Sequence, residues 1–222
     1  ELPESSVYFH DSIDYWDDKR RLGSYPAMVS RIQTAKDELS TFHITYLDGQ
    51  GNKAKVPQCK KVMPVLRPMV GGAIKIAKPV NNCLAIAEGI ETALSVQCFE
   101  GLPCWAAGSA NQLANVDIPS EVSELWIYSD IEESFTGLKA ASALANRMFQ
   151  KGVKVYLNFV IPSDTGIKYI TLNGEKNDFN DFIMQGQKAE KLKDHKAILE
   201  SQFGKVLNVE SEILKKELPE YF

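Results

Sequence analysis

Four short apolar runs, separated by segments of helical character, place the strongest constraint on the fold of this chain. The runs are residues 83–87, 103–107, 124–128 and 153–161, and the helical patterns between them cover residues 90–99, 111–115 and 137–151. A short, continuous apolar run is typical of a strand buried on both faces, and strands that alternate with helices form parallel sheets. The sequence therefore predicts an α/β fold with a parallel sheet, helices on both of its faces, and one further helix that begins near residue 177.

Residues 25–57 have a different pattern. Apolar residues recur there in the manner of exposed antiparallel strands, and turn signals stand at residues 37–38 and 48–51. Prolines and the pair Gly71–Gly72 then interrupt regular structure before the first buried strand. We therefore expect a small β-meander within a β-rich N-terminal subdomain at residues 1–80. The domain with the parallel sheet would cover residues 81–186, and a charged, helical appendage would cover residues 187–222.

The composition is that of an ordinary globular protein, because 44% of the 222 residues are hydrophobic and 24% are charged. No apolar run reaches the length of a membrane span, and the acidic start does not have the pattern of a signal peptide. We therefore expect a cytoplasmic protein with no membrane partner. Since the chain does not start with methionine, we also expect it to be a piece of a longer protein. The four cysteines and three histidines show no metal-ligand spacing, which favours reduced structural thiols.

Three acidic clusters follow predicted strands or begin a predicted helix. They are Glu88 with Glu91, Asp130 with Glu132 and Glu133, and Asp178 with Asp181. Because the carboxyl ends of neighbouring parallel strands meet at one edge of a sheet, we expect these carboxylates to surround one crevice. Mg²⁺ prefers oxygen ligands from a few carboxylates, water and substrate phosphates, so the clusters predict a magnesium site and phosphoryl or nucleotidyl transfer. The alternative for each cluster is structural, since acids stabilise helix N-termini, Asp and Asn cap helices, and acidic pairs are common in loops.

The basic residues are unevenly distributed. The net charge of -4 argues against a protein that coats nucleic acid by charge alone, yet residues 49–87 contain no acid and several lysines. We expect phosphate or nucleic-acid contacts from Lys60, Lys61, Arg67 and Lys75, and from Lys176 beside the third acidic cluster. A solvated, lysine-rich face is the alternative interpretation.

The order of these motifs resembles that of the Toprim domain, which is shared by bacterial-type primases, type IA and II topoisomerases and some nucleases. The stretch Ala-Glu-Gly-Ile-Glu-Thr-Ala-Leu at residues 87–94 is similar, letter for letter, to the Toprim module of primases from phages, plasmids and integrative elements. Ser129–Glu132, Thr136–Gly137 and Asp178–Asp181 resemble the later motifs of those primases, S-D-x-D, T-G and D-W-N-D. The resemblance extends to about residue 186.

The resemblance implies roles for particular residues. Glu88 corresponds to the glutamate that acts as general acid or base, or as metal ligand, in nucleotidyl transfer, and Asp130 and Glu132 correspond to the metal-binding pair. The second acid of that pair is glutamate here and not aspartate, so Glu133 is an alternative ligand. Glu91, Glu133, Asp178 and Asp181 would form an additional acidic site. The cofactor implied is Mg²⁺, or Mn²⁺ in its place.

Three functions are compatible with this pattern. The first is a primase core that synthesises primers on a DNA template during replication or transfer of a mobile element. Its partners would be a single-stranded DNA template, nucleoside triphosphates, and a helicase or other replication protein. The second is a Toprim module that binds replication proteins without catalysis, and the third is a metal-dependent nuclease that uses the same carboxylates.

Overall fold

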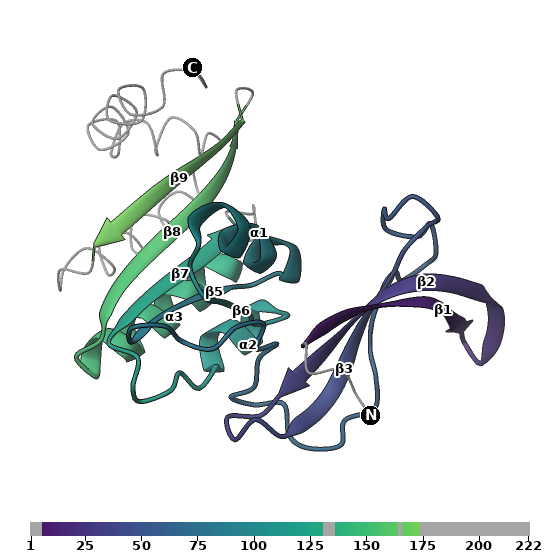
Figure 1. Ribbon diagram of the computed structural model, residues 1–222, viewed down its shortest axis with the longest axis horizontal. Coiled ribbons are helices and arrows are strands. Elements are labelled where there is room, and N and C mark those ends of the chain that lie inside the picture. The colour runs from purple at the N-terminus through teal and green to yellow at the C-terminus, as the bar shows by residue number, and fades with distance from the viewer. Residues whose placement is uncertain (1–5, 131–135, 164–165, 174–222) are drawn as a thin grey trace.

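The computed structural model describes residues 6–130, 136–163 and 166–173, and for Asp130 and residues 159–173 it describes the backbone alone. Within these residues the strands form two sheets, one with four strands and one with five (Figure 1). No helix among the described residues is long and apolar enough to cross a membrane.

The N-terminal sheet is an antiparallel meander. Its strands are β1 (Val7–Asp17), β2 (Arg20–Gln33), β3 (Leu39–Tyr46) and β4 (Lys60–Val62), and each pairs with the next in chain order. The predicted β-rich N-terminal part is therefore confirmed, although the meander begins at Val7 and not near residue 25. The β1–β2 hairpin turns at Asp18 and Lys19, whose φ angles of 41° and 66° are those of a tight two-residue turn.

Both faces of this sheet are covered in part. On one face Tyr15, Val29, Ile44 and Tyr46 are buried together with Ala54 of the following loop. On the other face Ile32 is buried against residues of the second sheet and its first helix. The alternation of side chains along a strand explains this division, because neighbouring residues point to opposite faces.

The second sheet has the strand order β6-β5-β7-β8-β9. Its strands are β5 (Cys83–Ala87), β6 (Cys104–Ala106), β7 (Glu124–Asp130), β8 (Lys154–Ser163) and β9 (Gly166–Asn173). The first four are parallel, as predicted, whereas β9 pairs antiparallel with β8 and was not predicted. The helix predicted near residue 177 lies outside the described residues.

Three helices cover the two faces of this sheet (Figure 1). Helix α1 (Ile90–Glu100) packs on one face against the small residues Ala85 and Ala87 of β5. Helices α2 (Ala110–Asn115) and α3 (Thr136–Gln150) pack on the other face against Leu84 and Ile127 and their neighbours. Each fully buried leucine or isoleucine contributes about 1.5–3 kcal/mol. The predicted parallel sheet with helices on both faces is thus confirmed.

Residues 73 and 74 join the two sheets through main-chain hydrogen bonds. Ala73 exchanges two such bonds with Gln33 of β2, with N–O distances of 2.8 and 3.0 Å, and Ile74 exchanges two with Ala106 of β6, again at 2.8 and 3.0 Å. Gly72, directly before them, leaves no room for a side chain, because an added Cβ would lie 2.7 Å from the carbonyl oxygen of Gln33. This short segment, called the connecting bridge below, fixes the N-terminal sheet to the edge of β6.

Candidate metal site at a strand switch point

The strand order identifies the place where a ligand is expected. From β5 the chain passes through α1 to β6 on one side of it, and from β7 it passes through α3 to β8 on the other side. Helices α1 and α3 lie on opposite faces of the sheet. In open α/β sheets, ligands bind outside the carboxyl ends of the two strands at which the order reverses in this way. These strands are β5 and β7.

The backbone brings Glu88 and Asp130 to this switch point. Ala87 at the end of β5 is paired with Tyr128 of β7, Glu88 follows Ala87 directly, and Asp130 is the last residue of β7. Neighbouring strands are about 5 Å apart, so both residues begin from the same edge of the sheet. The predicted convergence of the two acidic motifs on one edge agrees with this register.

The end of β5 is held firmly. The carbonyl oxygens of Ala87 and Glu88 accept hydrogen bonds from the backbone N–H groups of Ala107 and Gly108, both at 2.8 Å. Gly108 has a φ of 89°, a left-handed conformation that glycine adopts at least cost. Ser109 then caps α2, because its hydroxyl accepts a hydrogen bond from the backbone of Gln112. Glu88 itself is half-buried between these segments.

Glu91, predicted as part of an additional acidic site, forms ion pairs with the N-terminal sheet. Its carboxylate lies 3.1 Å from Nζ of Lys60 on β4 and 3.5 Å from Nζ of Lys53. Burial raises the pKa of Glu91, but a hydrogen bond from its own backbone N–H and the charges of Lys60 and Lys53 outweigh burial, so its pKa lies below the ordinary value. Lys60, predicted to contact phosphate, therefore already faces a carboxylate.

The other basic residues with a predicted phosphate role also have intramolecular partners. Lys61 donates to the carbonyl oxygen of Trp16 and lies over the ring of Tyr15, and Arg67 pairs with Glu38 at 3.5 Å. Lys75 pairs with Asp37 at 2.6 Å, and only 10% of its side chain is exposed. These contacts show what each side chain does in the absence of a ligand.

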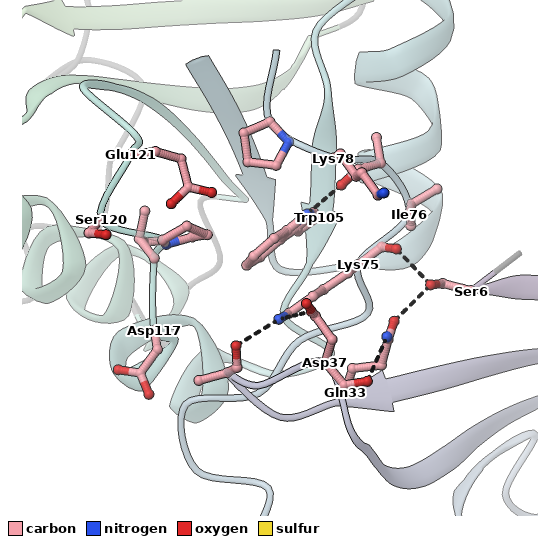
Figure 2. Close-up of a pocket in the computed structure, with 15 residues that line it drawn as sticks. Ser6, Gln33, Asp37, Lys75, Ile76, Lys78, Trp105, Asp117, Ser120 and Glu121 are labelled. Atoms are coloured by element: carbon pink, nitrogen blue, oxygen red, sulfur yellow. Dashed lines mark hydrogen bonds and ion pairs between the residues drawn. The ribbon is translucent and has the colours of Figure 1, made fainter. Parts of the chain in front are cut away.

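Lys75 lines a cavity of about 840 Å³ at the opposite edge of the second sheet. The lining residues 75–79 precede β5 and residues 117–121 precede β7, whereas Glu88 and Asp130 follow these strands. Figure 2 shows Lys75 extending toward Asp37 beside Trp105, with the indole of Trp105 donating to the linker. This cavity is separate from the switch point, and Lys75 belongs to the cavity.

Several predicted site residues cannot be placed. Glu132, Glu133, Asp178, Asp181 and Lys176 lie outside the described residues, as does the side chain of Asp130. Within the described part of the chain, no three His, Cys, Asp or Glu side chains gather closely enough to hold a metal ion. The metal ligands predicted from the sequence are mostly in the segments that this statement does not cover.

The strand order and the acidic residues at the switch point define a ligand-binding α/β fold of the doubly wound class. Comparison with protein families makes this specific: residues 83–189 match the Toprim domain and form such a domain in this chain. Residues 1–76 match a domain of unknown function (DUF7146). The predicted Toprim resemblance is thus confirmed. Comparison with curated proteins found no match.

Solved structures with a related fold include three primase structures. They are a DNA primase domain from Pseudomonas aeruginosa (12% identity, 78% of this chain and 56% of that chain, TM-score 0.44), the zinc-binding and RNA polymerase domains of the Aquifex aeolicus primase (17%, 74% and 38%, 0.43), and the RNA polymerase domain of Mycobacterium tuberculosis primase DnaG (16%, 70% and 53%, 0.40). The chain therefore spans about half or less of the length of the solved proteins that it matches.

Proposed function

We propose that this chain is the core of a metal-dependent nucleotidyltransferase of the primase type, which synthesises primers on a DNA template during replication or transfer of a mobile element. The observation that supports it best is the position of Glu88 and Asp130 at the ends of neighbouring parallel strands, at the switch point of a Toprim domain. The proposed division of labour follows the boundaries predicted above. Residues 81–186 would carry the chemistry, and residues 1–80 would hold the template.

The donor atoms suit a hard divalent cation. Asp130 and Glu132, or Glu133 in its place, would hold Mg²⁺ or Mn²⁺, because these ions prefer carboxylate oxygens together with water and phosphate. Such an ion, when bound, supplies positive charge that stabilises the triphosphate as it reacts. Glu88, held by the backbone hydrogen bonds at the end of β5, would act as general acid or base beside it.

The proposal does not depend on the basic residues named earlier. Lys60, Lys61, Arg67 and Lys75 each have an intramolecular partner, so contacts with phosphate would require those interactions to be given up. Lys176 is the remaining candidate for a phosphate contact. Its position next to the third acidic cluster is known from the sequence alone.

Primer synthesis by the full-length protein tests the proposal. The assay supplies single-stranded DNA, labelled nucleoside triphosphates and Mg²⁺ or Mn²⁺, and compares the wild type with Asp130→Asn and Glu88→Gln. Loss of a metal ligand or a general acid–base group is expected to reduce the rate by about 10²–10⁴-fold. Glu121→Gln is the matched control, because this exposed acid lies at the opposite edge of the sheet.

Wild-type rates in Asp130→Asn would show that the proposal is wrong. The same reagents distinguish the other functions considered. Cleavage of labelled DNA without primer synthesis would identify a nuclease, and absence of Mn²⁺ binding in calorimetry would favour a module that binds proteins without catalysis.

A further inference from the structure

Glu91 connects the first turn of α1 to the N-terminal sheet. One carboxylate oxygen lies 3.1 Å from Nζ of Lys60 and 3.5 Å from Nζ of Lys53, and the other lies 3.5 Å from Lys60. Lys60 belongs to β4, and Lys53 belongs to the loop between β3 and β4, where it is bridged to Leu47. A single side chain of the Toprim domain thus contacts two cations of the other sheet. We call this set of contacts the Glu91 bridge.

Stability does not explain the Glu91 bridge. Between 40% and 56% of each of the three side chains is exposed, and exposed ion pairs contribute about 0–1 kcal/mol because water screens them. The interaction is too weak to hold two sheets together against a large force. It is nevertheless strong enough to select one orientation among several of similar energy.

The sheet beneath the Glu91 bridge lacks the apolar packing found elsewhere in the junction. Ser30, His43 and Thr45 lie on the face of the N-terminal sheet that carries Lys60, and they are buried to 93% or more. Ser30 Oγ, His43 Nδ1 and Thr45 Oγ1 have no hydrogen-bond partner among the described residues. Nearer the connecting bridge, by contrast, Ile32 and Ile74 pack in an apolar cluster with Ala87 and Ile90. Orientation at the polar end therefore depends on the ion pairs.

Glu88 lies next to the turn that the Glu91 bridge holds. Gly89 is the N-cap of α1 and provides no side-chain cap, so Ile90, which is 2% exposed, and Glu91 anchor the first turn. Glu91 is three residues after Glu88, and the intervening residues are the start of the helix. A displacement of this turn moves Glu88, and a misplacement of about 1 Å can lower a rate by about 100-fold.

We propose that Glu91 is a positioning residue for the reaction proposed above, and not a metal ligand. Through Lys60 and Lys53 it sets the position of Glu88 relative to the N-terminal sheet, along which the template would lie. The inference rests on the proposed function for its consequence in catalysis. It also gives Lys60 a role in the Glu91 bridge in place of the predicted contact with phosphate.

A charge swap separates positioning from metal binding, because a lysine cannot take the place of a carboxylate ligand. The full-length protein is compared as wild type, Glu91→Gln, Glu91→Lys, Lys60→Glu and the double variant Lys60→Glu/Glu91→Lys. We expect kcat for primer synthesis to fall about 10- to 100-fold in each single variant, in line with the cost of misplacing a catalytic group. In the double variant we expect most of the rate to return, while the Kd for Mn²⁺, measured by electron paramagnetic resonance, stays at the wild-type value throughout.

Glu38→Gln is the matched control. Glu38 pairs with Arg67 at 3.5 Å with similar exposure, but both residues belong to the N-terminal part of the chain. Wild-type kcat is expected for this variant. Loss of Mn²⁺ affinity in Glu91→Gln, or a double variant no more active than Glu91→Lys, would overturn the assignment.

A measurement of orientation keeps the inference separate from the proposed function. Spin labels on the exposed Cys98 of α1 and on a cysteine introduced at the exposed Lys19 of the β1–β2 turn report the distance between the two parts, with Cys59 replaced by serine. The distance distribution should broaden in Glu91→Lys and narrow again in the double variant. Wild-type protein that makes no primers would refute the proposed function alone, whereas an unchanged distribution in Glu91→Lys would refute the Glu91 bridge.

Discussion

Replacement of Gly72 by alanine tests the connecting bridge between the two sheets. The added Cβ would lie 2.7 Å from the carbonyl oxygen of Gln33 and 3.0 Å from that of Met69, and ordinary contact begins at 3.4 Å. Both obstacles are backbone atoms that already accept hydrogen bonds, from Ala73 and from Gly72 and Gln112. They cannot rotate away as the end of a side chain would.

The expected cost combines two effects. Overpacking of a closed site costs about 1–3 kcal/mol, and each hydrogen bond that is stretched to relieve it costs up to about 1 kcal/mol. We therefore expect Gly72→Ala to lower the free energy of unfolding by about 2–4 kcal/mol. For a chain of this size that loss corresponds to a fall in Tm of about 4–16 °C.

Urea unfolding and thermal unfolding, both followed by circular dichroism, measure the effect. Gly49→Ala is the matched control, because a Cβ at Gly49 would meet nothing within 4 Å. That variant should be as stable as the wild type or slightly more stable, since alanine restricts the unfolded chain. If Gly72→Ala unfolded at the same urea concentration as Gly49→Ala, the tight crossing at residue 72 would be an incorrect description of the protein.

Three further predictions concern stability and reactivity. Burial, and then the charge of Lys60, lower the pKa of His43, while Glu91 raises it by a smaller amount, so the net pKa is below 6.5. The unfolded chain then binds the proton more readily, and the stability that neutral His43 contributes above pH 6.5 is lost as the pH falls through the folded-state pKa. The free energy of unfolding should decrease with a slope of at most about 1.4 kcal/mol per pH unit, and His43→Leu should flatten that slope. Leu125→Ala, at a fully buried position of β7, should cost about 2–5 kcal/mol in urea unfolding, and a loss below 1 kcal/mol would contradict the packing described. Burial raises the pKa of the Cys104 thiol, so maleimide should label the exposed Cys98 first and reach Cys104 only on unfolding, as mass spectrometry of the labelled peptides would show.

The alternation of strands and helices in the Toprim domain was predictable because each element carries a local signal. The apolar run at residues 83–87 and the alanine-rich helix that ends before Gly152 are recognisable without knowledge of their neighbours. The edge strand β9 carries a weaker signal, since residues 166–173 mix lysine, threonine and asparagine with isoleucine and leucine. The same is true of β1, where most side chains between Phe9 and Ser12 are exposed and polar.

The candidate site was predictable in its backbone and not in its contacts. The convergence of Glu88 and Asp130 follows from the rule that parallel strands end at the same edge, so sequence position was enough to suggest it. The pairing of Glu91 with Lys60 joins residues 31 positions apart on different sheets, and no local pattern encodes it. The engagement of Lys75 with Asp37 and Trp105 was missed for the same reason, because the sequence shows a charge but not its counterion.

The connecting bridge also determines how the molecule can be divided. A fragment that starts at residue 81, the predicted boundary, would leave behind Ile74, whose main chain pairs with Ala106 of β6. The outer side of β6 would then be an open edge with unsatisfied donors and acceptors, and such edges recruit other chains. Fragments that begin before residue 73 should consequently stay monodisperse at concentrations where shorter ones precipitate.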